Sequence, residues 1–111
     1  MGWWFGSSAP AWPCTPAAAT SWAGGDHIVE QHVHNLDVMN WYIGDHPSKA
    51  LGFGGRARRK TGNQFDFHSV DFEYPEGVHI HSMCRQINGT EGGVKERLVG
   101  ETGLAGGLKP D

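Results

Sequence analysis

The chain has 111 residues, a formal net charge of −3 with neutral histidines and a pI of about 6.1. This length is enough for one small domain. The acidic balance argues against a nucleic-acid-binding protein, because such proteins present basic faces. No apolar run approaches the roughly 20 residues that a membrane-spanning helix needs. We therefore expect neither a nucleic-acid partner nor a membrane partner.

The two cysteines, Cys14 and Cys84, form neither a disulfide framework nor a CxxC metal pair. Such sparse cysteine usage is typical of a reducing compartment. The N-terminus is apolar, but it lacks the basic segment of a secretory signal and contains helix-breaking prolines. We therefore predict a cytoplasmic protein.

Residues 1–23 carry no charged side chain and show neither a helical nor a strand period. We expect an irregular leader there, either disordered or foreign to the rest of the domain. Its four tryptophans leave open an aromatic docking segment, because disordered tails are normally poor in aromatic residues. The patterned domain covers residues 24–103, and residues 104–111 form a tail.

Residues 24–43 have the spacing of one amphipathic helix. Asp26 can cap its first turn, and Gly44 followed by Pro47 ends it. The apolar positions recur every three or four residues and cover one arc of the helix: Ile28, Val29, Val33, Leu36, Met39 and Ile43. The opposite side carries His27, Glu30, His34, Asp37 and Trp41.

After Pro47 the pattern changes to that of strands. We predict strands at residues 49–58, 64–74, 78–87 and 94–99, with a tight turn at Pro75-Glu76-Gly77. The second of these has either a bulge near His68-Ser69 or a division into two short strands. Their short connections favour antiparallel neighbours. The expected fold class is α+β, with one amphipathic helix packed on a mostly antiparallel sheet of about four strands.

Glu30, His34 and Asp37 form an acid–base stripe along the helix. Residues three and four apart on a helix touch, so a Glu30 carboxylate can hold the His34 imidazole and Asp37 can orient the same ring. A positioned histidine is the commonest general acid–base group. The stripe is therefore a candidate catalytic set, although a solvated polar face with incidental pairs gives the same pattern.

Other polar residues have alternative interpretations. His27, Glu30 and His34 have a spacing compatible with zinc or iron, but the segment is not HExxH and we assign no metal ligand set. His32 falls on the apolar side, which predicts a buried core histidine. His79 and His81 share a strand face with Met83 and Arg85, which favours a solvent-facing or interface surface. The run of residues 56–60 is interpreted as a strand end and loop, with an anion contact as the alternative.

The segment GGDHIVEQHVHNLDVMNW (residues 24–41) resembles the second sequence motif of the Gfo/Idh/MocA oxidoreductases. That motif has two glycines, a short apolar run, an acid, three residues, His, two residues and Asp. Glu30, His34 and Asp37 occupy its positions without a gap, although the family more often has Asp where this chain has Glu30. The segments FHSVDFEYPEGVHIHSMCRQI and ERLVGETG also resemble the substrate domain of this family. The resemblance covers about residues 22–103.

The resemblance implies an NAD(P)-dependent dehydrogenase acting on a sugar, polyol or similar hydroxylated small molecule. His34 would give or take the proton at the hydroxyl or carbonyl carbon, Glu30 would orient the substrate or His34, and Asp37 would support them. His27 and Arg85 are candidate substrate contacts. In this family an N-terminal Rossmann domain binds the dinucleotide and supplies a Lys from an EKP-like motif.

This chain contains neither a GxGxxG fingerprint after a strand nor an EKP motif. We therefore expect a partial C-terminal substrate domain that has no cofactor-binding residues, binds no NAD or NADP alone and is catalytically silent. A truncated sheet exposes an edge strand, which favours homo-oligomers formed through the sheet. Two alternatives remain: a non-catalytic binding or oligomerisation module, and a His/carboxylate metal-binding protein.

Overall fold

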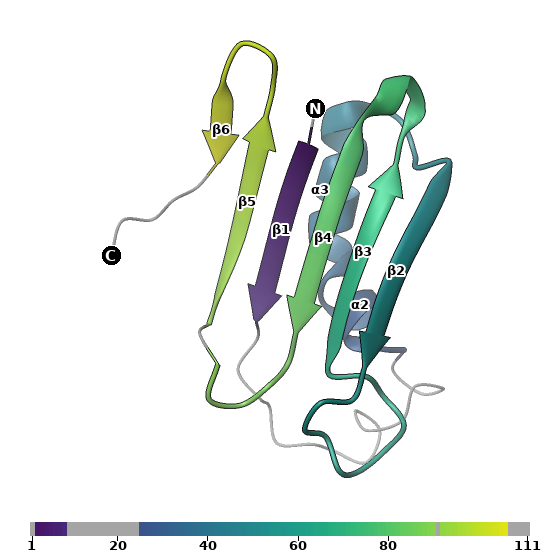
Figure 1. The fold of residues 1–111 in the computed structure, drawn as a ribbon, viewed down its shortest axis with the longest axis vertical. Coiled ribbons are helices and arrows are strands. Elements are labelled where there is room, and N and C mark those ends of the chain that lie inside the picture. The colour runs from purple at the N-terminus through teal and green to yellow at the C-terminus, as the bar shows by residue number, and fades with distance from the viewer. Residues whose placement is uncertain (1, 9–24, 91, 107–111) are drawn as a thin grey trace.

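The computed structural model describes residues 2–8, 25–90 and 92–106. Figure 1 shows a sheet with a pair of helices behind it. The elements in chain order are β1 (Gly2–Ser8), α2 (His27–Glu30), α3 (Val33–Ile43), β2 (Lys49–Gly55), β3 (Phe67–Glu73), the 3-10 turn η2 (Pro75–Gly77), β4 (His79–Arg85), β5 (Gly93–Val99) and β6 (Leu104–Gly106).

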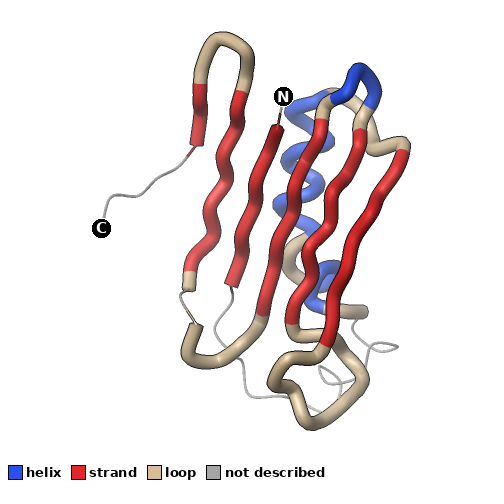
Figure 2. The backbone as a smooth tube through the Cα atoms, in the orientation of Figure 1, coloured by secondary structure: helices blue, strands red, loops and turns tan. Residues whose placement is uncertain are grey.

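The strands form one sheet in the order β2-β3-β4-β1-β5-β6. All neighbouring strands are antiparallel except β1 and β4, which are parallel. Both helices lie on the same side of this sheet, and no helix of the described residues covers the other side (Figure 2). The predicted α+β class with a mostly antiparallel sheet is confirmed, and the sheet has more strands than expected.

β1 corrects the prediction of an irregular leader. Gly2–Ser8 pair with β4 on one side and with β5 on the other, so this segment joins the two halves of the sheet. Its partners β4 and β5 lie far along the chain, so local patterning did not reveal this strand. The prediction for residues 9–24 lies outside the described residues.

The single predicted helix is divided in two. α2 ends at Glu30 and α3 begins at Val33, and the backbone N–H groups of both Gln31 and His32 donate to the carbonyl of His27. The Asp26 side chain does not cap α2, because its Oδ1 accepts instead from the backbone N–H of Phe65 at 3.0 Å. The predicted end at Gly44 is confirmed, and this residue has the left-handed φ of 77° that favours glycine.

The strand predicted at residues 49–58 ends early, at Gly55. The reason is Asp66, whose carboxylate accepts hydrogen bonds from the backbone N–H groups of Ala57, Arg58 and Arg59 at 2.7–2.9 Å. These N–H groups therefore bond to a side chain within a loop and not to a neighbouring strand. They also lower the pKa of Asp66 against the opposing effect of its burial, which is the largest single influence.

Three further strand predictions need correction. The strand predicted at residues 64–74 begins only at Phe67. The bulge near His68-Ser69 is absent, because β3 pairs in continuous register with both β2 and β4. β6 forms at Leu104–Gly106, where we expected a tail.

The hydrophobic core is small and lies between α3 and the sheet. Met39, Tyr74 and Ile80 are buried, and the half-buried side chains around them are Ile43, Phe72, Val78 and Leu98. The Tyr74 hydroxyl donates to the Asn40 side-chain oxygen, which ties the end of β3 to α3. In the described residues no helix is long and apolar enough to cross a membrane.

The helices are rotated relative to the predicted apolar arc. Met39 is buried as expected, but Val29 and Val33 are exposed. In their place His27 and His32 point inward and are almost completely buried. The side of the helices that contacts the sheet is therefore partly polar, and the side that faces solvent is partly apolar.

Candidate functional site

Glu30, His34 and Asp37 are all exposed, on the side of the helices that faces away from the sheet. Glu30 comes from the last turn of α2, whereas His34 and Asp37 come from α3. Within the described residues no hydrogen bond or ion pair joins the three side chains, so the structure does not show the expected Glu30–His34 contact. It does place all three on the solvent-facing side that the periodicity predicts.

Apolar side chains surround this stripe. Val33, Trp41 and Tyr42 of α3 are 41%, 80% and 64% exposed, and the rings of Trp41 and Tyr42 meet edge to face. We call the whole surface the outer helix face, consisting of Val29, Glu30, Val33, His34, Asp37, Val38, Trp41 and Tyr42. A cluster of exposed aromatic and branched side chains is typical of an interaction surface.

The structure does not bring the candidate substrate contacts to the stripe. His27 is only 3% exposed and lies between α2 and the sheet. Arg85 ends β4 and is exposed. Successive side chains of a strand point to opposite faces, and Ser82 contacts the helices through His32. Arg85 therefore lies on the side of the sheet away from the helices and from the stripe.

Three histidines form a group between the helices and the sheet, in which His27 and His32 are buried and His68 is half-buried. His32 is 1% exposed, and its Nε2 lies 2.6 Å from the Ser82 Oγ, which confirms the predicted core histidine. His27 joins it from α2, and His68 joins it from β3. The Nε2 atoms of His27 and His68 are buried without a hydrogen-bond partner. We call His27, His32 and His68 the histidine layer.

Burial keeps the histidine layer neutral. It lowers the pKa of His32 to about 4, and repulsion from His27 and His68 adds to this effect. Burial is also the main cause of the lowered pKa of His27, followed by the His68 and Arg59 charges. For His68, burial lowers the pKa although Asp26 and Asp66 oppose it. The sequence pattern did not single out His68, because its position beside the other two histidines depends on the pairing of β3 with β4.

Neither a thiol nucleophile nor a metal centre emerges from these residues. Burial raises the pKa of Cys84 to about 12, so its side chain stays a thiol at neutral pH. In the described residues no three His, Cys, Asp or Glu side chains are placed to hold one ion. The expected metal alternative is not supported, since His27 is buried whereas Glu30 and His34 face solvent.

The described residues do not fit a dinucleotide. A pyrophosphate binds where a glycine-rich turn leads from a strand into a helix with free N–H groups. α2 has four residues and begins beside the carboxylate of Asp26, which would repel an anion. The 3-10 turn η2 has the acidic residue Glu76 in its first turn, which would also repel an anion. These residues therefore offer no cradle for NAD or NADP.

No protein-family model matches the sequence, and no curated protein matches it. Among solved structures the fold matches GenD2. Its crystal structure is described as GenD2 from gentamicin A biosynthesis in complex with NAD. The TM-score is 0.75 over 96% of this chain, at 17% sequence identity. This chain spans 30% of the GenD2 chain. The likeness shows that this small domain shares its fold with part of an NAD-bound protein.

We expect acid to destabilise the histidine layer. Its histidines have lowered pKa values in the folded chain, so between pH 6.5 and about 4 the unfolded chain binds more protons. Stability should be full above pH 6.5 and should fall as the pH drops through this window. Each such histidine contributes a slope of at most about 1.4 kcal/mol per pH unit. Urea unfolding at several pH values measures this slope.

His27→Leu should flatten this dependence, because it removes one buried imidazole whose Nε2 has no hydrogen-bond partner. His46→Gln is the matched control, since His46 is an exposed histidine outside the layer. A free energy of unfolding that does not change between pH 7 and pH 4.5 would contradict the prediction. An equal flattening by both substitutions would also contradict it.

Proposed function

We propose that this chain is part of an NAD(P)-dependent dehydrogenase of the Gfo/Idh/MocA type, acting on a sugar, polyol or similar hydroxylated small molecule. The observation that supports the proposal is the outer helix face, where Glu30, His34 and Asp37 are all exposed on helical surface. Their spacing matches the family motif without a gap. In this role His34 gives or takes the substrate proton, Glu30 orients the substrate or His34, and Asp37 supports them.

The apolar part of the outer helix face supports a second domain over the stripe. Single exposed apolar side chains are common on protein surfaces, but Val33, Trp41 and Tyr42 are all exposed on α3, the helix that carries His34 and Asp37. A domain covering them would bury this apolar surface and exclude water from His34. Carboxylate–imidazole interactions strengthen when water is excluded. The stripe would then work at an interface between two domains.

The proposal also requires a dinucleotide domain. The fold neighbour GenD2 was crystallised with NAD and is longer than this chain, which spans 30% of it. We propose that a Rossmann domain encoded with this unit brings the nicotinamide and the EKP-like Lys to His34. When bound, the nicotinamide accepts or donates the hydride. His27 and Arg85 take no part in this proposal, because the structure places them away from the stripe.

We expect the isolated chain to give no NAD(P)-linked turnover on a panel of sugars and polyols. A second observation to make beside this assay is the nucleotide sequence upstream of the Met1 codon. A glycine-rich fingerprint after a strand and an EKP-like Lys are expected there, and the extended protein should be active. In that protein His34→Ala should lower kcat by about 10²–10⁴-fold, the usual contribution of a general acid–base.

His46→Ala is the control for that experiment, because His46 is exposed and lies outside the stripe. Measurable turnover by the purified 111-residue chain would contradict the proposal. Full activity of the His34→Ala protein would also contradict it.

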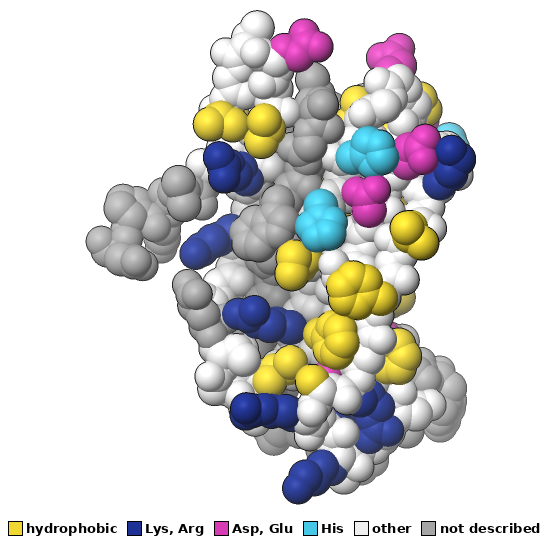
Figure 3. Space-filling model, viewed as in Figure 1, with side chains coloured by type: hydrophobic (Ala, Val, Ile, Leu, Met, Phe, Trp, Pro, Cys, Tyr) yellow, Lys and Arg dark blue, Asp and Glu magenta, His cyan; other side chains and the backbone are white. Residues whose placement is uncertain are grey.

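A second candidate function is that of an oligomerisation module, and the uncovered side of the sheet favours it. We call this side the outer sheet face. Leu51 and Phe53 of β2 are 81% and 70% exposed, and Leu51 is the register partner of Asp71 on β3. Figure 3 shows apolar side chains gathered over β2, β3 and β4, with basic side chains toward β5. A second copy stacked on this face would bury the apolar patch and bring acidic and basic groups together.

Analytical sedimentation measures the oligomeric state that this second function requires. The chain should sediment as a homo-oligomer, and the Leu51→Lys, Phe53→Lys double variant should shift it toward the monomer, because buried charges oppose stacking. Val29→Lys on the outer helix face is the matched control and should leave the oligomer intact. A monomeric wild-type chain at all concentrations would exclude this candidate.

A further inference from the structure

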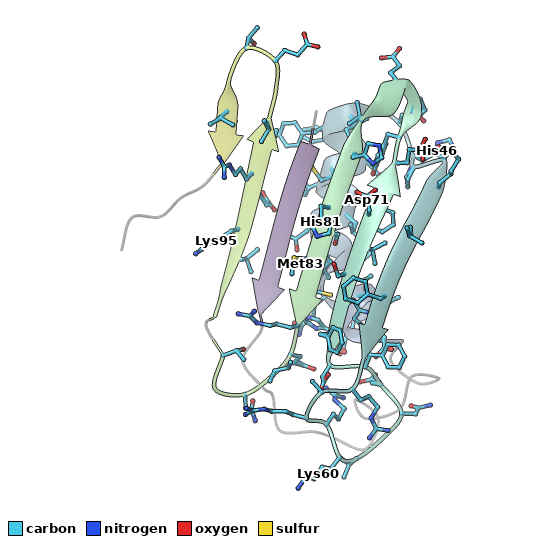
Figure 4. All side chains as sticks on the ribbon, in the orientation of Figure 1. His46, Lys60, Asp71, His81, Met83 and Lys95 are labelled. Carbon is cyan, nitrogen blue, oxygen red and sulfur yellow. The ribbon has the colours of Figure 1, made fainter. Side chains whose placement is uncertain are left out.

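Two histidines and two carboxylates stand together at one end of the outer sheet face. His79 and His81 are two residues apart on β4 and therefore project from the same side of the sheet. On β3, Glu73 is the register partner of His79, and Asp71 is the register partner of His81. Figure 4 labels Asp71 and His81 beside one another in front of the sheet. This group lies on the side away from the histidine layer.

Asp71 fixes the chemical state of the His79 ring. The Asp71 Oδ2 lies 2.9 Å from the His79 Nδ1. An ionised carboxylate can only accept hydrogen bonds, so in the neutral form of the ring the proton lies on Nδ1 and Nε2 keeps its lone pair. The side chains of His79 and Asp71 are 45% and 42% exposed. A carboxylate that holds one imidazole nitrogen while the other is available is the arrangement that orients metal-ligating histidines.

The positions of His79 and His81, two residues apart on one strand, suit a chelate. Residues two apart on a strand rise by about 6.6–6.8 Å, and imidazole nitrogens bind zinc at about 2.0–2.1 Å. Imidazole is a ligand for Zn²⁺, Cu²⁺ and Ni²⁺. We propose that His79 and His81 chelate a divalent transition-metal ion on the outer sheet face, and that Asp71 orients His79 for this role.

The expected site has two protein ligands, with water completing the coordination. No third His, Cys, Asp or Glu of the described residues converges with these two. Glu73 is held instead by Lys49, whose Nζ lies 3.2 Å from both carboxylate oxygens. Because the site is half exposed, the ion keeps part of its hydration. The proposal does not depend on the dehydrogenase function.

His46 provides a matched control on the same chain. Its Nδ1 lies 3.0 Å from the Asp45 Oδ1, so it is another exposed histidine beside a carboxylate. No second histidine lies two residues away from it. The pair of imidazoles on one strand face is therefore what distinguishes His79 and His81 from His46.

The test is calorimetric titration of the untagged chain with Zn²⁺ at pH 7.5. Wild type should bind one ion per chain, and His79→Ala or His81→Ala should abolish this binding. Asp71→Asn should weaken it by about 10–100-fold, the usual effect of losing a carboxylate that orients a ligating histidine. His46→Ala and His34→Ala should bind like wild type. Proton NMR should show Zn²⁺ shifting the ring signals of His79 and His81.

Equal Zn²⁺ affinity in wild type and in the His79→Ala and His81→Ala variants would overturn the proposal. The absence of binding by wild type at millimolar Zn²⁺ would also overturn it, as would loss of binding in His46→Ala. Far-UV circular dichroism confirms that each variant folds. The His79→Gln and His81→Gln variants repeat the test with polar side chains that leave the strand surface hydrophilic.

Discussion

The hydrogen bond between His32 and Ser82 decides which side of the helices faces solvent. It lies at the break between α2 and α3 and joins that break to the centre of β4. With His32 directed at the sheet, His34 and Asp37 must point away from it, because residues two and five positions along a helix fall on other faces. The exposed acid–base stripe is thus a consequence of a buried polar contact.

This arrangement leaves apolar side chains exposed on two opposite sides of the domain. The core between α3 and the sheet is small, and part of the layer beside it is filled by imidazoles rather than hydrocarbon. Apolar side chains remain exposed on both the outer helix face and the outer sheet face. A unit built in this way gains stability when partners bury those faces. The proposed dinucleotide domain on one side and a second copy on the other fit this need.

Local patterns predicted the α+β class, the end of the helix at Gly44 and the buried His32, because each depends on neighbouring residues. The pattern did not predict β1, whose partners β4 and β5 are distant in sequence. It also placed Val29 and Val33 in the core, because a single helical period cannot anticipate the break at Gln31-His32. The stripe was recognisable from the motif, whereas the Asp71–His79 pair required the register of β3 and β4.

The most direct test of this account is chemical modification of the histidines with diethyl pyrocarbonate, followed by peptide mass spectrometry. The reagent modifies accessible imidazole nitrogens, so it reports which side of the helices faces solvent. The account predicts rapid modification of His34 and His46 and strong protection of His27 and His32 in the folded chain. Modification of His32 as fast as His34 would contradict it, because the helices would then not be held on the sheet by that face.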